Sequence, residues 1–248
     1  MHSMRGVRPG MPDEGHDYSG TLNSFELSFK ESRIVVYCDL DSCREARKEL
    51  EKTYTLLEGY IRNSPFYQST YEPLRVGDNA PGIVQEMAES SRKAGCGPMA
   101  CVAGAFSEHL RDFLLESGAT EAIVENGGDI ALKVNKKVTI GLYAGSSPYS
   151  GRIALKVKPE DTPLGVCTSS ASVGHSISLG EADSVTVLSD STPLADGAAT
   201  AIANQVRGAN PVQNALMHAR KIEGIRGAMI VLDSELGCWG SLPEIIRI

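Results

Sequence analysis

The segment LADGAATA at residues 194–201 sets a carboxylate and a hydroxyl four residues apart among small side chains. On a helix this spacing places Asp196 and Thr200 on one face, one turn apart. Oxygen ligands separated by only Gly and Ala let a divalent cation and a polyphosphate approach the backbone closely. On spacing alone, the commoner interpretation is an ordinary helix, with the Asp near its first turn and the Thr bonded back to a carbonyl.

Two further segments carry residue types suited to ligand binding. Asn126-Gly127-Gly128-Asp129 predicts a tight turn between two strands, and its glycines would also let a ring or a phosphate lie against the main chain. The hydroxyl-rich stretch 165–174 is either a polar surface loop or a set of donors facing a ligand. His175 follows this stretch directly and is the candidate catalytic base. A Ser-His-Asp triad lacks support, because no G-x-S-x-G segment occurs.

Composition restricts the class of protein. A chain of 248 residues with 42% hydrophobic residues can build a sizeable core. Its net charge of −7 argues against a nucleic-acid surface, and its apolar stretches are too short to cross a bilayer. Residues 1–23 contain no apolar signal-peptide region and are expected to form a flexible tail, followed by a single domain over 24–248. We therefore expect a cytoplasmic protein without nucleic-acid or membrane partners.

The six cysteines are expected to be mostly buried free thiols, since neither C-x4-C pair has a neighbouring His. Cys96 and Cys101 leave two interpretations open. They are either two packed thiols or a redox or metal pair. In the second case, a thiol in the first turn of the following helix would have its pKa lowered by the helix dipole.

The order of predicted elements favours an α+β fold with a largely antiparallel sheet, because strands cluster after helices instead of alternating with them. Helices are expected over residues 41–61, 82–94, 99–116, 194–206 and 211–222, with Asp41 as the N-cap of the first. Strands are expected over 25–32, 33–39, 122–124, 129–134, 138–143, 153–157, 183–188, 228–232 and 235–239.

Four segments, taken in chain order, resemble motifs of the ApbE superfamily, the flavin transferases that move FMN from FAD onto a Thr or Ser of a target protein. Residues 195–201 are similar to the family's Ala-Asp-Ala-x-x-Thr-Ala magnesium motif. Residues 99–106 resemble its small-residue helix start, and 125–130 its Asn-x-Gly-Gly-Asp-Ile turn. Residues 166–170 resemble its Ala-Thr-Ser-Gly loop.

The resemblance implies two intimately packed lobes sharing a mostly antiparallel sheet, with FAD as substrate or ligand and an acceptor protein as partner. It implies magnesium held by Asp196, Thr200 and a main-chain carbonyl near Ala100. The residues that would contact the flavin nucleotide are polar or lack a side chain: Asn126, Gly127, Gly128, Asp129, Thr168, Ser169 and Glu108. Assembly into a homo-oligomer stays open.

Three departures from the family pattern leave a second function open. Ala103 stands where the family has Lys, Glu108 stands where it has Asp, and residues 175–180 lack an Asp and a Pro of the corresponding segment. The alternatives are therefore FMN transfer or FAD hydrolysis, on the one hand, and a non-catalytic flavin- or nucleotide-binding accessory protein, on the other. The chain looks most like a compact branch from anaerobic prokaryotes, which is associated with sulfide assimilation and homocysteine formation.

Overall fold

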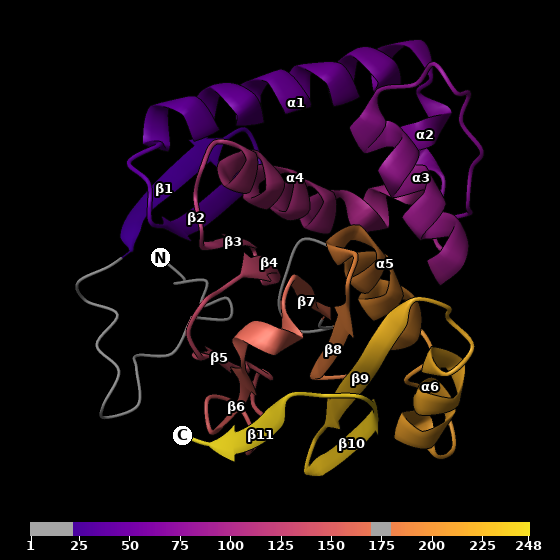
Figure 1. Cartoon of the computed structure of the whole chain (residues 1–248). Coiled ribbons are helices and arrows are strands. Elements are labelled where there is room, and N and C mark those ends of the chain that lie inside the picture. The colour runs from indigo at the N-terminus through magenta and orange to yellow at the C-terminus, as the bar shows by residue number, and fades with distance from the viewer. Residues whose placement is uncertain (1–21, 170–179) are drawn as a thin grey trace.

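The computed structural model describes residues 22–169 and 180–248, and its main element is an eight-stranded sheet (Figure 1). Every neighbouring pair of its strands is antiparallel. In spatial order the strands are β1 (Asn23–Phe29), β2 (Ser32–Cys38), β3 (Ala122–Asn126), β4 (Asp129–Lys133), β7 (Leu164–Ser169), β8 (Ser184–Ser189), β9 (Ile225–Leu232) and β10 (Glu235–Gly240). The prediction of an α+β fold with a mostly antiparallel sheet is confirmed.

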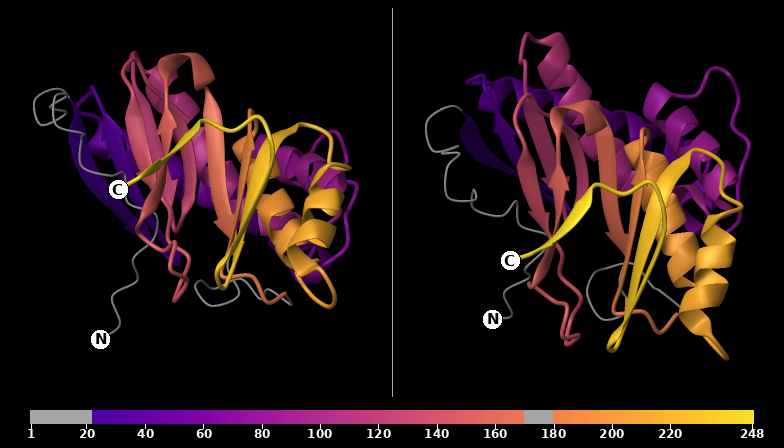
Figure 2. Two further views of the ribbon diagram at one scale, coloured as in Figure 1. Left: turned by 90° about the horizontal axis from the view of Figure 1, so that it is seen from below. Right: turned by 60° about the horizontal axis from the view of Figure 1, so that its bottom comes forward.

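Helices cover one side of this sheet, and a second, three-stranded sheet lies on the other side (Figure 2). The helices are α1 (Cys43–Asn63), α2 (Phe66–Ser69), α3 (Gly82–Ala94), α4 (Val102–Glu116), α5 (Thr192–Ala203) and α6 (Pro211–Ala219). The small sheet has the order β11 (Glu244–Arg247), β6 (Ile153–Val157) and β5 (Val138–Gly141). Two short 3-10 helices are η1 (Pro98–Cys101) and η2 (Pro159–Asp161).

The alternation of side chains along the strands separates two hydrophobic cores. Val124 and Cys167 belong to the core under the helices, whereas their chain neighbours Ile123 and Val166 belong to the core under the small sheet. Successive side chains of a strand point to opposite faces, so both faces of the central strands are buried. The helices therefore contact only one face, where α5 packs against β7, β8, α3 and α4.

The turn between β3 and β4 has the conformation that its two glycines predict. Gly127 has φ +67° and Gly128 has φ +108°, values that L side chains rarely adopt. Asn126 pairs with Asp129 across this two-residue turn. The turn fixes the position of Asp129 as the first residue of β4, next to β7.

Several predicted boundaries differ from the structure. The N-cap of α1 is Ser42, not Asp41. Residues 165–169 of the predicted polar loop belong to β7, because Gly165 to Ser169 pair with β8. Strand β11, which the sequence analysis did not predict, pairs with β6. Within the described ranges, no helix is long and apolar enough to cross a membrane.

Candidate functional site

Only two residues of helix α5 are not buried, and they are the two that its sequence singles out. Ten of its twelve residues are buried, and the exceptions are Asp196 and Thr200. The small side chains between them allow α5 to lie between the sheet and its neighbours α3 and α4. As a result, the side chains of α5 that are not buried are one carboxyl and one hydroxyl, one helical turn apart.

Asp196 also binds the N-terminus of the neighbouring helix. Its Oδ2 accepts a hydrogen bond from the backbone N–H of Gly104, 2.8 Å away, and the N–H of Ala103 donates to the same carboxylate. Both donors lie in the first turn of α4, where backbone N–H groups lack helical partners and negative charge is favourable. Asp196 therefore anchors α4 to α5.

Asp129 lies close enough to Asp196 for the two carboxyl groups to interact electrostatically. Burial raises the pKa of the Asp129 carboxyl to about 7, although interactions with the Cys167 side chain and the Thr168 backbone lower it. Burial and then the Asp129 charge raise the pKa of Asp196 well above its usual range. Neither pKa is lowered by a Lys or Arg side chain. The two neighbouring carboxyls therefore lack a cationic partner among the described residues.

The remaining polar residues predicted for the nucleotide site lie on β3 and β7, beside Asp129. The Asn126 amide donates to the carbonyl of Ala103 at 3.4 Å. A Cβ built on Gly128 would lie 4.0 Å from the Thr168 carbonyl oxygen. The Thr168 hydroxyl pairs with that of Thr186 at 2.9 Å, whereas the buried Ser169 hydroxyl has no hydrogen-bond partner among residues 22–169 and 180–248. Within that part of the chain, the Ser169 hydroxyl is an unused donor at the end of β7.

These contacts connect all four motifs, since Ala103 and Gly104 of the 99–106 segment bond to Asn126 and Asp196. The β3–β4 turn, the end of β7 and the start of α5 meet around Asp129 and Asp196. The segment before α4 also lies beside α5, since a Cβ on Gly197 would meet the sulfur of Cys101, the residue after Ala100. His175 lies outside the described residues. The ligand roles of all these residues stay predictions.

The Glu108 carboxylate does not lie with Asp129 and Asp196 but is hydrogen-bonded to the start of α5. Its Oε2 accepts hydrogen bonds from the N–H and the hydroxyl of Thr192, each at 2.7 Å. Thr192 is the first residue of α5, so Glu108 of α4 binds the start of α5 just as Asp196 of α5 binds the start of α4. The Arg111 guanidinium lies 3.6 Å from the same Glu108 oxygen. In the described structure, Glu108 joins two helices.

The variant Glu108→Ala is expected to lower the free energy of unfolding by about 2–3 kcal/mol, because the buried donors of Thr192 would lose their acceptor. Glu116→Ala is the matched control on the same helix, since Glu116 is exposed. It should change this free energy by no more than about 0.5 kcal/mol. Urea unfolding of both variants measures the difference. Equal effects would contradict the role of Glu108 as a link between α4 and α5.

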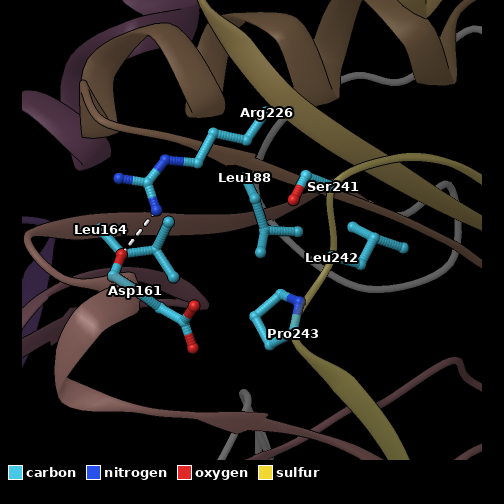
Figure 3. A pocket seen from close by; sticks show the side chains of 7 residues that line it. All are labelled: Asp161, Leu164, Leu188, Arg226, Ser241, Leu242 and Pro243. Carbon is cyan, nitrogen blue, oxygen red and sulfur yellow. Dashed lines mark hydrogen bonds between the residues drawn. The ribbon is translucent and has the colours of Figure 1, made fainter.

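Two cavities lie apart from the Asp129–Asp196 pair. One, of about 40 Å³, is lined by Asp161, Leu164, Leu188, Arg226, Ser241, Leu242 and Pro243, and Arg226 donates to the Asp161 carbonyl there (Figure 3). The other is a groove of about 440 Å³ whose lining is mostly charged: Glu49, Lys52, Glu86, Glu108, His109, Asp112, Phe113 and Glu116. Of the predicted site residues that the structure describes, only Glu108 lines either cavity.

The donor set around Asp196 fits a hard divalent cation. Within the described ranges, no group of three or more His, Cys, Asp or Glu side chains is placed to hold a metal. Magnesium needs no such group, because it binds through one or two carboxylates and takes its other ligands from water and phosphate. Two neighbouring carboxyls with raised pKa values and the adjacent, partly exposed hydroxyl of Thr200 match this requirement.

The thiols differ from one of the sequence predictions. All six cysteines, which lie in the described ranges, are free. The pKa of Cys101 is raised, not lowered by a helix dipole, because of its hydrogen bond with Cys96, burial and nearby negative groups. Burial likewise raises the pKa of Cys167 well above its usual range. No local pattern in the sequence indicates the contact of Cys167 with Asp129.

Comparison with known proteins identifies the family of the chain. A family model described as "AbpE bacteria" matches residues 16–236. The chain belongs to the ApbE-like superfamily. Relatives named UPF0280 protein include one from Methanococcus vannielii, 42% identical over 91% of this chain and 94% of the relative. Another, from Methanosarcina acetivorans, is 40% identical over 89% of this chain and 88% of the relative.

Solved ApbE structures share the fold at low sequence identity. The flavinyl transferase ApbE of Pseudomonas stutzeri superposes with a TM-score of 0.60 at 17% identity, over 90% of this chain and 94% of that one. The ApbE protein of Thermotoga maritima gives a TM-score of 0.55 at 13% identity, over 88% and 96%. The ApbE-like fold therefore extends over nearly the whole of each protein.

Because the pKa of Asp129 is raised, we expect the free energy of unfolding of this ApbE-like protein to depend on pH when no metal is present. Its pKa is about 7 in the folded protein and 3.8 in an unperturbed Asp. Between these values the folded state binds more protons than the unfolded state. The free energy of unfolding therefore falls as pH rises, by at most about 1.4 kcal/mol per pH unit from this group.

The stability difference between wild type and Asp129→Asn, measured by urea unfolding with EDTA from pH 5 to 8, should follow this slope. A difference independent of pH would contradict it.

Proposed function

We propose that the protein binds FAD with magnesium at Asp196 and Thr200 and transfers the FMN portion onto a Ser or Thr hydroxyl of a partner protein. The observation that carries this proposal is the partly exposed Asp196–Thr200 pair on α5, next to a second carboxyl and without a cationic side chain beside it in the described structure. The ApbE-like fold supports it, since the solved relatives are flavin transferases.

Each residue of the site would have a role that follows from its chemistry. Asp196, Thr200 and the main-chain carbonyl of Ala100 would hold magnesium, which neutralises charge on the FAD pyrophosphate. The turn at Gly127 and Gly128 lets a ring or phosphate lie against the backbone. The hydroxyl of Ser169, which has no hydrogen-bond partner among the described residues, would donate to the ligand.

The reaction breaks the phosphoanhydride bond of the FAD pyrophosphate and forms a phosphate ester with the acceptor. The acceptor oxygen forms a bond to the FMN phosphorus, the bond to the AMP phosphate breaks, and AMP leaves with the electron pair. The proton of the acceptor hydroxyl needs a base, for which His175 is the sequence-predicted residue. When water takes the place of the protein hydroxyl, the same step hydrolyses FAD to FMN and AMP.

Two observations favour a second candidate function, a flavin-binding accessory protein without turnover. Ala103 replaces the lysine of the family motif, and Asp196 already binds the N-terminus of α4. Loss of the lysine charge, or engagement of Asp196 by the α4 backbone, would weaken the binding of phosphate groups. In this case FAD binds to the same surface without reaction.

The proposal also places the protein in the cytoplasm. Its six free thiols fit a reducing compartment, where structural disulfides are rare.

Incubation of the protein with FAD and magnesium separates these functions. The transferase proposal predicts release of AMP that stops when EDTA removes the metal. It also predicts FAD binding, measured by calorimetry, that tightens with magnesium. FAD binding without AMP release and without magnesium dependence would support the accessory protein. Absence of FAD binding with and without magnesium would contradict both.

A further inference from the structure

Two thiols meet directly behind the Asp196 segment. A Cβ built on Gly197 would lie 2.6 Å from Cys101 Sγ and 3.1 Å from Cys96 Sγ, so both sulfur atoms flank this glycine. The Cys96 and Cys101 thiols are also hydrogen-bonded to each other. Two thiols must lie next to each other before a disulfide can form between them, and these two, five residues apart in the chain, do so.

The two thiols differ in their access to solvent. Cys101 has no exposed surface, whereas Cys96 is 8% exposed. Cys96 lies in the turn between α3 and η1, where Gly95 has φ +75°. A small oxidant can therefore reach Cys96 first, with Cys101 next to it as the second thiol.

We propose that Cys96 and Cys101 are an oxidation site that forms a reversible disulfide on reaction with hydrogen peroxide. The thiolate of Cys96 attacks one peroxide oxygen, and the other oxygen leaves and becomes water, so that Cys96 becomes a sulfenic acid. The Cys101 sulfur then attacks the Cys96 sulfur, and the sulfenic oxygen leaves as a second water with the Cys101 proton. In sum, two thiols lose two electrons and two protons, and one peroxide is reduced to two waters.

Oxidation changes the packing against α5. The bond brings the two sulfur atoms to about 2.05 Å from each other, well inside their contact distance. Because both sulfurs flank Gly197, and Gly197 follows Asp196 in the chain, the α5 backbone beside the carboxyl must adjust. A resulting change in FAD affinity rests on the proposed function, whereas formation of the disulfide does not.

The test uses the full-length protein, titrated with hydrogen peroxide and digested after its remaining thiols are blocked. We expect two of the six thiols to be lost, a peptide pair linked through Cys96 and Cys101, and recovery of both thiols on treatment with dithiothreitol. Loss of thiols elsewhere with Cys96 and Cys101 unchanged, or only irreversible sulfinic acid at Cys96, would overturn the proposal. The mapping is done on the wild type and so does not depend on whether a variant folds.

Matched variants identify the partners. Cys96→Ser should prevent the reversible loss of two thiols, whereas Cys238→Ser, at an exposed cysteine on β10, should leave it unchanged. A linked peptide pair that joins Cys101 to Cys167 in the wild type would contradict the assignment. Calorimetry of FAD with magnesium on reduced and oxidised protein then tests the coupling. Equal affinities overturn the coupling alone, and no binding in either state contradicts the proposed function but leaves the disulfide standing.

Discussion

Asp196→Asn is expected to lower the magnesium-dependent release of AMP from FAD by about 100-fold or more. The amide oxygen of Asn can still accept the hydrogen bond from the Gly104 N–H, so the contact with α4 is retained while the charge is removed. Loss of a metal ligand removes several kcal/mol of charge stabilisation, which corresponds to at least this factor in rate. AMP release at saturating FAD with and without magnesium measures the effect.

The same variant should be more stable than the wild type when no metal is present. The raised pKa of Asp196 means that its charge destabilises the folded protein at neutral pH, and Asn removes that charge. Asp78→Asn, in an exposed loop, is the control and should change neither activity nor stability. If Asp196→Asn keeps full activity, or loses activity only because it unfolds, the carboxylate has no role as a metal ligand.

Gly104→Ala is expected to lower the free energy of unfolding by about 3 kcal/mol, because α4 and α5 touch through their backbones at this point. The added Cβ would lie 2.6 Å from the carbonyl oxygen of Thr192 and 2.8 Å from the Cβ of Asp196. Neither atom is the end of a flexible side chain, so the helices must separate. Their separation also strains the bond from the Gly104 N–H to Asp196.

Gly59→Ala provides the matched control in a second helix. Gly59 lies in α1, and a Cβ built there meets no atom within 4 Å. Alanine should therefore stabilise the protein by about 0.5–1 kcal/mol through its greater helix propensity. Chemical denaturation of both variants measures the contrast. A Gly104→Ala protein as stable as the wild type would mean that α4 and α5 are not in close backbone contact.

Turns and helix ends that depend on residues close together in the chain could be predicted from the sequence. The two glycines at 127 and 128 require positive φ and so predict the β3–β4 turn, which the structure has. Helix α3 begins at Gly82 and ends at Ala94, as predicted, because a glycine in the left-handed region follows it. The spacing of Asp196 and Thr200 predicted their common face on α5, and both keep exposed surface there.

Contacts between distant segments could not be predicted from spacing. Glu108 and Thr192 are 84 residues apart, and Gly104 and Asp196 are 92 residues apart, yet each pair binds a helix start to the neighbouring helix. No local pattern distinguishes a carboxylate that binds a helix N-terminus from one that binds only metal. The contact of Cys167 with Asp129 likewise depends on β4 and β7 being neighbours in the sheet.

The position of a bound cation tests the central claim most directly. Crystals soaked with FAD and Mn²⁺, as a substitute for magnesium that scatters anomalously, would locate the metal. We predict one anomalous peak about 2.2 Å from an Asp196 carboxylate oxygen and the Thr200 hydroxyl, with the FAD pyrophosphate as a further ligand. A peak only in the acidic groove that contains Glu49, Glu86 and Asp112, or FAD bound away from α5, would contradict the account.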